Sequence, residues 1–236
     1  MRRTLGFCLF MAVALGQQKN FVSCPIVRDT KTVPCFLAEY EGETYYLGIQ
    51  QDITNDFHPP QLKHEVLVEG TVAEGPRVCG GIPLKPVFIS VMKEVNLACN
   101  TLLPAEPGIE APLAARGPGP SSRHAESVRT PGGPDFTLLY AFNDDYLEFA
   151  ANQTVSDAAA YAKKIGSSNV RVSGYRASAL LSNGQTLIEK AGLAEKRAQN
   201  IATLLRGLGI SNITVESKNE PEPGASSRRV TIVVNP

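Results

Sequence analysis

The stretch that decides the fold of this chain reads Val170-Arg171-Val172-Ser173-Gly174-Tyr175-Arg176-Ala177, and its first part, residues 169–175, is typical of a strand. After a polar loop the chain continues as Leu193-Ala194-Glu195-Lys196-Arg197-Ala198. That second stretch lies on an apolar stripe with alternating gaps of four and three residues: Leu187, Ala191, Ala194, Ala198, Ile201, Leu205 and Leu208. The stripe predicts one long helix along residues 187–208, which Gly209 would end.

Working outward, the flanking segments alternate in type. Residues 136–142, 212–216 and 228–234 are typical of strands. Residues 154–165 are typical of a helix, with Thr154 as its N-cap and Gly166 as its stop signal. The resulting order, βαβαββ, predicts an α+β domain with helices on one face of a mixed sheet.

Together with Arg228-Arg229-Val230, these stretches resemble the OmpA-like C-terminal domain, a peptidoglycan-associating module of the cell envelope. The family's motifs are G-H-T-D at the end of the strand, L-S-x-x-R-A on the helix and N-R-R-V on the last strand. This chain keeps the glycine, Leu193, Arg197 and Ala198, and the final R-R-V. The resemblance covers residues 136–236 and implies the same fold that the pattern of elements predicts.

The resemblance also implies a ligand site for the diaminopimelate of the stem peptide, in which an aspartate takes the ammonium group and an arginine takes the carboxylate. Arg197 falls on that arginine, but Ala177 falls on the aspartate and Lys190 on a supporting asparagine. We therefore expect a degenerate peptidoglycan site built from Arg197, Arg228 and Arg176. Arg176 would suit a carboxylate or phosphate but repel an ammonium group.

A plainer interpretation of the arginines remains open. Arg197 could be a solvated helix residue, or could pair with the final strand. Arg228 and Arg229 would face opposite ways on a strand, so one could join the site while the other lies at the surface.

The N-terminal half, residues 17–103, holds the cysteines expected in the mature protein: Cys24, Cys35, Cys79 and Cys99. An even number in an exported chain favours two disulfides. Three connectivities are possible, and the most local one, Cys24–Cys35 with Cys79–Cys99, is preferred. A hairpin around residues 36–50 and strands at 65–72 and 86–91 predict a small, disulfide-stapled all-β domain, with an OB-like barrel as its possible topology.

The remaining segments predict an exported, two-domain chain. Residues 1–16 read as a signal peptide with Arg2 and Arg3 before a short apolar run, although the run could be retained as an anchor. Residues 104–134 are rich in Pro, Gly, Ala and Ser and predict a linker, with a packed irregular loop as the alternative; residues 135–236 form the OmpA-like domain. Beyond the signal, no apolar run is long enough for a transmembrane segment in the mature chain.

The composition and the residue spacings disfavour several classes of function. With 23 basic and 23 acidic residues the chain has no basic excess that would suggest nucleic acid. We expect neither a cofactor nor a metal site, because His58 and His64 lack a third ligand at suitable spacing. No catalytic constellation supports an enzyme, so an exported hydrolase is the weakest hypothesis.

The leading hypothesis is a protein of the periplasm, associated with cell wall or outer membrane, that binds peptidoglycan non-covalently. The alternative is an envelope scaffold whose OmpA-like domain no longer binds peptidoglycan and whose N-terminal domain binds a protein partner.

Overall fold

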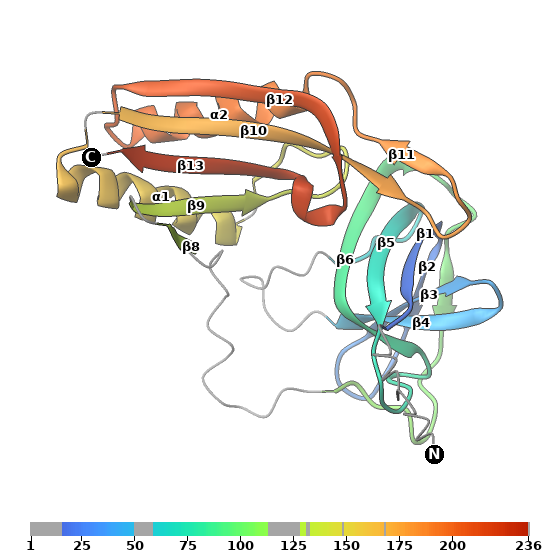
Figure 1. The fold of residues 1–236 in the computed structure, drawn as a ribbon. Helices are drawn as coiled ribbons and strands as arrows, with labels where there is room; N and C mark the ends of the chain where they lie inside the picture. Colours follow the sequence, from blue (N-terminus) through green and yellow to red (C-terminus); the bar gives the residue numbers. More distant parts are fainter. Residues whose placement is uncertain are drawn as a thin grey trace, which may run out of the picture.

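The protein is seen here in a computed structural model that describes residues 16–49, 59–112, 128–130, 133–147, 149–167 and 169–235. The segment predicted as a signal peptide, up to residue 15, and residues 113–127 of the predicted linker lie outside these ranges. Within the described part, the strands form a seven-stranded sheet in the N-terminal half and a six-stranded sheet in the C-terminal half (Figure 1).

The strands of the first sheet are β1 (Gln18–Ser23), β2 (Pro25–Arg28), β3 (Cys35–Tyr40), β4 (Glu43–Ile49), β5 (His64–Val72), β6 (Ile82–Val95) and β7 (Thr101–Leu103). Their order in the sheet is β1-β5-β6-β4-β3-β2-β7, and β6 is long enough to pair with β4 at its start and β5 along the rest. The sheet curls, so that β1 also contacts β3 and β2 contacts β5. The all-β domain expected from the sequence is confirmed, with a core around Phe21, Leu47 and Val68.

The predicted hairpin at residues 36–50 is formed by β3 and β4. Its two-residue turn, Glu41 and Gly42, has positive φ at both positions (53° and 77°). This is the backbone of the tight turn whose twist matches that of the flanking strands. The glycine that marks the turn in the sequence is therefore required by its backbone conformation.

Both expected disulfides are present, but the preferred pairing is wrong: Cys24 bonds Cys99, and Cys35 bonds Cys79. The reason lies in the sheet. Strand β2 pairs in parallel with β7, and the register that places Ile26 beside Thr101 also brings Cys24 level with Cys99. Strand pairing thus joins residues 75 positions apart, which loop length alone would disfavour.

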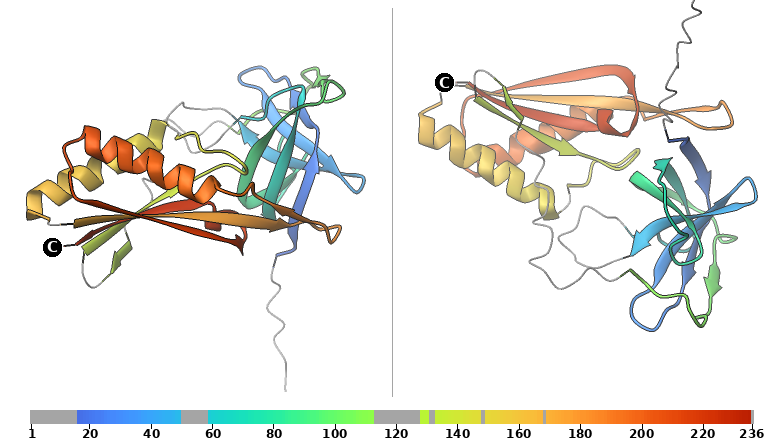
Figure 2. Two further views of the ribbon diagram at one scale, coloured as in Figure 1. Left: turned by 90° about the horizontal axis from the view of Figure 1, so that it is seen from above. Right: turned by 60° about the horizontal axis from the view of Figure 1, so that its bottom comes forward.

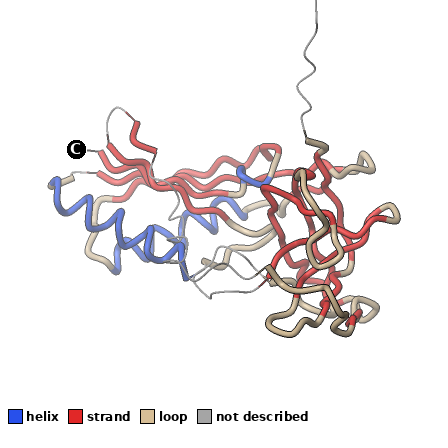
Figure 3. Tube along the Cα trace, turned by 90° about the horizontal axis from the view of Figure 1, so that it is seen from below, coloured by secondary structure: helices blue, strands red, loops and turns tan. Residues whose placement is uncertain are grey.

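The second sheet has the expected βαβαββ order, with two short additions. Its elements are β8 (Val128–Thr130), β9 (Gly133–Leu139), α1 (Phe149–Ile165), β10 (Asn169–Leu180), β11 (Thr186–Ile188), α2 (Leu193–Gly207), β12 (Ile213–Pro223), the short 3₁₀ turn η1 (Ala225–Ser227) and β13 (Arg229–Asn235). The order β11-β10-β13-β9-β8 is antiparallel, and β12 lies parallel to β10. Both helices cover one face of this sheet (Figure 3), as the sequence predicts.

The helices begin elsewhere than predicted. Helix α1 starts at Phe149, so Thr154 is an interior, buried residue and not the N-cap. Helix α2 starts only at Leu193, because Leu187 belongs to β11 and Gly192 adopts a left-handed conformation (φ 79°). The apolar stripe includes Leu187 because this residue of β11 is partly buried against Leu67, Phe142, Ala179 and Leu181, so its apolar side chain serves the strand and not the helix. No described helix is long and apolar enough to cross a membrane.

Helix α2 lies very close to β10 at Gly174. A Cβ built on this glycine would lie 1.9 Å from the carbonyl oxygen of Ala194. We expect Gly174→Ala to lower the free energy of unfolding by about 3 kcal/mol or more, because α2 would have to move away from the sheet. Urea unfolding followed by circular dichroism measures this, with Gly207→Ala, where nothing lies within 4 Å, as the control. Equal stability of the two variants would contradict the close packing.

The two sheets also pack against each other. The end of β10 and the loop after β9 supply Ala179, Leu181 and Phe142, which cluster with Leu67 of β5. At the edge of this cluster the backbone N–H of Phe142 donates to Ser90 Oγ of β6 at 2.8 Å. Figure 2 shows the hairpin of β10 and β11 reaching across to β1, where Asn20 and Ser182 exchange two hydrogen bonds through backbone and side chain.

Candidate functional site

Arg197, the residue on the family arginine, lies on the first turns of α2 and is completely buried. Its guanidinium uses every donor that it has. Nε donates to the carbonyl of Asp144 at 2.7 Å, and the two terminal nitrogens donate to the carbonyls of Tyr175 and Ala141 at 3.2 and 3.1 Å. The remaining two donors go to one carboxylate, that of Glu189.

Glu189 follows β11 directly, and its side chain is as buried as that of Arg197. Oε1 accepts from Arg197 at 2.7 Å and from the backbone N–H of Asn143 at 3.0 Å. Oε2 accepts from Arg197 at 3.0 Å and from the backbone N–H of Ala177 at 2.8 Å. Each carboxylate oxygen thus accepts two hydrogen bonds, which is its full capacity.

An aromatic ring lies against the buried pair. The guanidinium carbon of Arg197 lies 4.7 Å from the centre of the Tyr140 ring, a cation–π distance. Burial raises the pKa of the Tyr140 phenol, against the opposing effect of the Arg197 charge. Removing two charges from water is costly, and complete hydrogen bonding is what makes such a buried pair tolerable.

Local sequence explains how the partners reach Arg197. Asn143 has positive φ (57°), a conformation that asparagine adopts more readily than most residues. Its backbone N–H faces Glu189, while its side-chain oxygen accepts from the backbone N–H of Lys190 at 2.8 Å. The asparagine therefore ties the loop after β9 to the segment that carries Glu189.

The other residues that the family pattern assigns to the site do not converge on one place. Ala177, on the family aspartate, is fully buried beside Glu189, after an irregularity in the pairing of β10 with β12. Arg176 on the preceding position is half-buried, and its Nε has no hydrogen-bond partner among the described residues. Lys190 lies at the surface, with its side chain 66% exposed.

Arg228 is buried as well, but at a different place. Its terminal nitrogen lies 2.6 Å from Oε2 of Glu69 on β5, with side-chain exposures of 2% and 5%. Its Nε donates to the carbonyl of Tyr140 at 3.3 Å. This ion pair joins the C-terminal domain to the N-terminal one. Arg229 faces the other way, pairs with Glu222 and stacks on the Tyr175 ring, so the expected opposite orientation is found.

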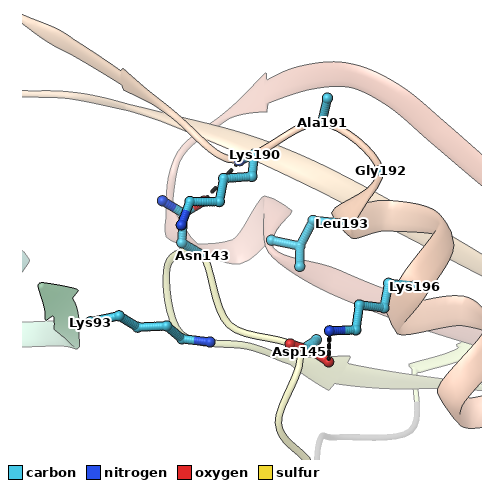
Figure 4. Close-up of a pocket in the computed structure, with 8 residues that line it drawn as sticks. All are labelled: Lys93, Asn143, Asp145, Lys190, Ala191, Gly192, Leu193 and Lys196. Atoms are coloured by element: carbon cyan, nitrogen blue, oxygen red, sulfur yellow. Dashed lines mark hydrogen bonds and ion pairs between the residues drawn. The ribbon is translucent and has the colours of Figure 1, made fainter.

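A surface pocket of about 360 Å³ lies beside the buried pair, between the two domains (Figure 4). Its charged lining comes from Lys93 of β6, from Lys190 and Lys196, and from Asp145. Burial works against ionisation of Asp145, but the hydrogen bond and charge of Lys196 outweigh it and lower its pKa. Lys196 lies 3.0 Å from Asp145, and Lys93 lies 2.9 Å from Asp144. The pocket therefore offers both signs of charge, with three lysines facing one aspartate, so its lining is positive on balance.

The sequence pattern singles out Arg197 and Arg228 as candidate site residues, but it does not indicate the acids that pair with them, Glu189 and Glu69. In the sequence, the only signal for Glu189 is that it is the acid nearest to the polar loop. The only signal for Glu69 is that it is a polar position in a strand of alternating apolar and polar residues. In the described part of the chain, no three His, Cys, Asp or Glu residues come close enough to hold a metal ion. His58 lies outside the described residues.

No family model and no curated protein matches the chain. Part of the chain is similar to solved structures. One is the OmpA-like domain of FopA1 from Francisella tularensis subsp. tularensis SCHU S4, at 25% identity and a TM-score of 0.37, covering 44% of this chain and 73% of that one.

Two further solved structures are similar over the same share of the chain. The periplasmic domain of Helicobacter pylori MotB is 18% identical with a TM-score of 0.35, covering 44% of this chain and 83% of that one. An outer membrane protein from Borrelia burgdorferi B31 is 18% identical with a TM-score of 0.34, covering 46% and 94%.

Proposed function

We propose that this protein is an exported, non-enzymatic protein of the cell envelope whose OmpA-like domain is a structural scaffold and not a receptor for the stem peptide. The proposal of export is supported by the signal-like start of the sequence and by the two disulfides, which persist in oxidising compartments. The proposed location is the periplasm, in association with the cell wall or outer membrane.

The observation that carries the proposal is the carboxylate of Glu189 on Arg197. The family resemblance implies that this arginine takes a ligand carboxylate, but here all five of its donors are used within the chain. Ala177 supplies no charge for a ligand ammonium group. A zwitterionic ligand therefore meets neither of the two groups that would recognise it.

The second arginine has a structural role in the same proposal. Arg228 is paired with Glu69 across the domain boundary, so it holds the N-terminal domain in place and is not exposed to a ligand. The OmpA-like domain then serves as a base that presents the disulfide-stapled domain. We propose that the latter binds another protein of the envelope.

One observation favours peptidoglycan binding as a second candidate function. The pocket beside Glu189 is open to solvent and offers Asp145 together with Lys190 and Lys196. Such mixed charges suit a peptide that carries both carboxylate and ammonium groups. Exposed groups of this kind contribute little each, about 0–1 kcal/mol, so binding here would be weak.

Sedimentation with purified, insoluble peptidoglycan sacculi separates the two functions. We expect the mature protein to remain in the supernatant, and Ala177→Asp to remain there too, because the added acid would lie beside Glu189 with Arg197 already occupied. An OmpA-like domain that carries both family charges serves as the positive control. Retention of the wild type that is lost in Lys190→Ala would instead establish peptidoglycan binding at the pocket.

A further inference from the structure

We propose that the niche around Arg197 is a carboxylate-binding site that this chain fills with its own Glu189, and that a small free carboxylate binds there when the Glu189 carboxylate is absent. The niche consists of the donors that converge on Glu189: both terminal nitrogens of Arg197 and the backbone N–H groups of Asn143 and Ala177. The inference rests on the proposed function in treating Glu189 as the resident occupant.

The donors of the niche are held in place by groups other than Glu189. The guanidinium is fixed by the carbonyls of Asp144, Tyr175 and Ala141 and by the Tyr140 ring. The N–H of Ala177 belongs to β10, which is paired on both sides along most of its length. Removing the Glu189 carboxylate would therefore leave four preoriented donors and one positive charge facing an empty space.

The chemistry of the niche selects its ligand. Two parallel N–H groups of a guanidinium match the two oxygens of a planar carboxylate, and the two backbone N–H groups supply one further bond to each oxygen. A chloride ion presents a single acceptor atom and so cannot place one acceptor at each of the two positions that the carboxylate oxygens occupy. The class of ligand is thus a small monocarboxylate, or the carboxylate at the end of a flexible side chain or peptide.

The surface pocket described above lies close to the niche. Glu189 immediately precedes Lys190, and Asn143 bonds to both residues through its N–H and its side chain. Asn143 and Lys190 also line the surface pocket of about 360 Å³. Glu189 therefore lies one residue along the chain from the lining of a surface pocket, and we infer that a small anion would enter from this side.

Chemical rescue tests the inference on the full mature chain with its disulfides intact. Glu189→Ala removes CH₂COO⁻ beyond Cβ, and acetate replaces those atoms almost one for one. We expect 0.2 M sodium acetate to raise the melting temperature of Glu189→Ala by on the order of 5 °C relative to sodium chloride of equal ionic strength. The wild type and the surface control Glu195→Ala should show no such difference. If Glu189→Ala is unfolded in chloride, the same prediction is tested by its circular dichroism spectrum, which should return to that of the folded protein when acetate is added.

Two further variants make the result specific. Glu189→Gln fills the niche with an uncharged side chain, so it should be less stable than wild type and should not respond to acetate. In Glu189→Ala combined with Arg197→Met, the response to acetate should disappear.

An equal response to acetate and chloride, or a Glu189→Gln variant as stable as wild type, would overturn the inference. Sacculus sedimentation of the wild type is a separate measurement: retention there would refute the proposed scaffold function and leave the rescue result standing.

Discussion

Arg197→Met is expected to lower the free energy of unfolding by about 3–5 kcal/mol, because it leaves the Glu189 carboxylate buried without its positive partner. Methionine keeps the length and apolar stem of arginine, so the loss reports the charge and hydrogen bonds more than the volume. The carboxylate would retain only the N–H groups of Ala177 and Asn143. Urea unfolding measured by circular dichroism gives the change directly.

The matched control is Arg206→Met, near the end of the same helix and exposed. It should change stability by no more than about 0.5 kcal/mol. The double variant Glu189→Leu with Arg197→Met should regain part of the loss, because neither charge then remains buried. A destabilisation of Arg197→Met no larger than that of the control would show that Arg197 is not buried as described. On the family resemblance alone, one would expect this arginine to be replaceable without loss of stability.

The second large effect concerns the domain boundary. Arg228→Met should destabilise the protein by about 3–5 kcal/mol, since it leaves Glu69 buried and unpaired between the two sheets. The loss should also weaken the contact between the domains. Arg229→Met is the matched control: the neighbouring residue pairs with Glu222, both side chains are partly exposed, and the loss should cost about 1 kcal/mol or less.

Limited trypsin digestion turns this prediction into a measurement of domain association. We propose that Arg116 and Arg123, in the Pro- and Gly-rich segment, are the first cleavage sites. Both disulfides lie within the N-terminal domain, so no covalent bond would then join the halves. The nicked wild type should elute from a size-exclusion column as one complex, and the nicked Arg228→Met protein as two fragments. Dissociation of the wild-type halves would contradict the interface.

Much of the C-terminal domain could be predicted from the sequence, because its determinants are local. The apolar stripe through Ala194, Ala198 and Ile201 predicts a helix, and these residues lie on the buried face of α2. Gly174 marks the point where that helix approaches the sheet. The N-terminal hairpin is equally local, since Gly42 can adopt the positive φ that its turn requires.

The errors arose where neighbours in sequence were taken for neighbours in space. Thr154 has the chemistry of an N-cap, but α1 begins five residues earlier and buries it. The local cysteine pairing was preferred, whereas the register of β2 with β7 decides that Cys24 meets Cys99. For the cysteines, a long-range strand pairing outweighs the local preference.

The sequence by itself determined which residues of the family pattern this chain keeps: Arg197 and Arg228 are present, and an alanine replaces the acid at position 177. Only the tertiary structure decided what those arginines do. Glu189 reaches Arg197 because β11 turns back along β10, and Glu69 reaches Arg228 because the two sheets pack together. A buried charge must find an opposite charge wherever the fold supplies one, and the partner's identity depends on distances in space that no local pattern of residues records.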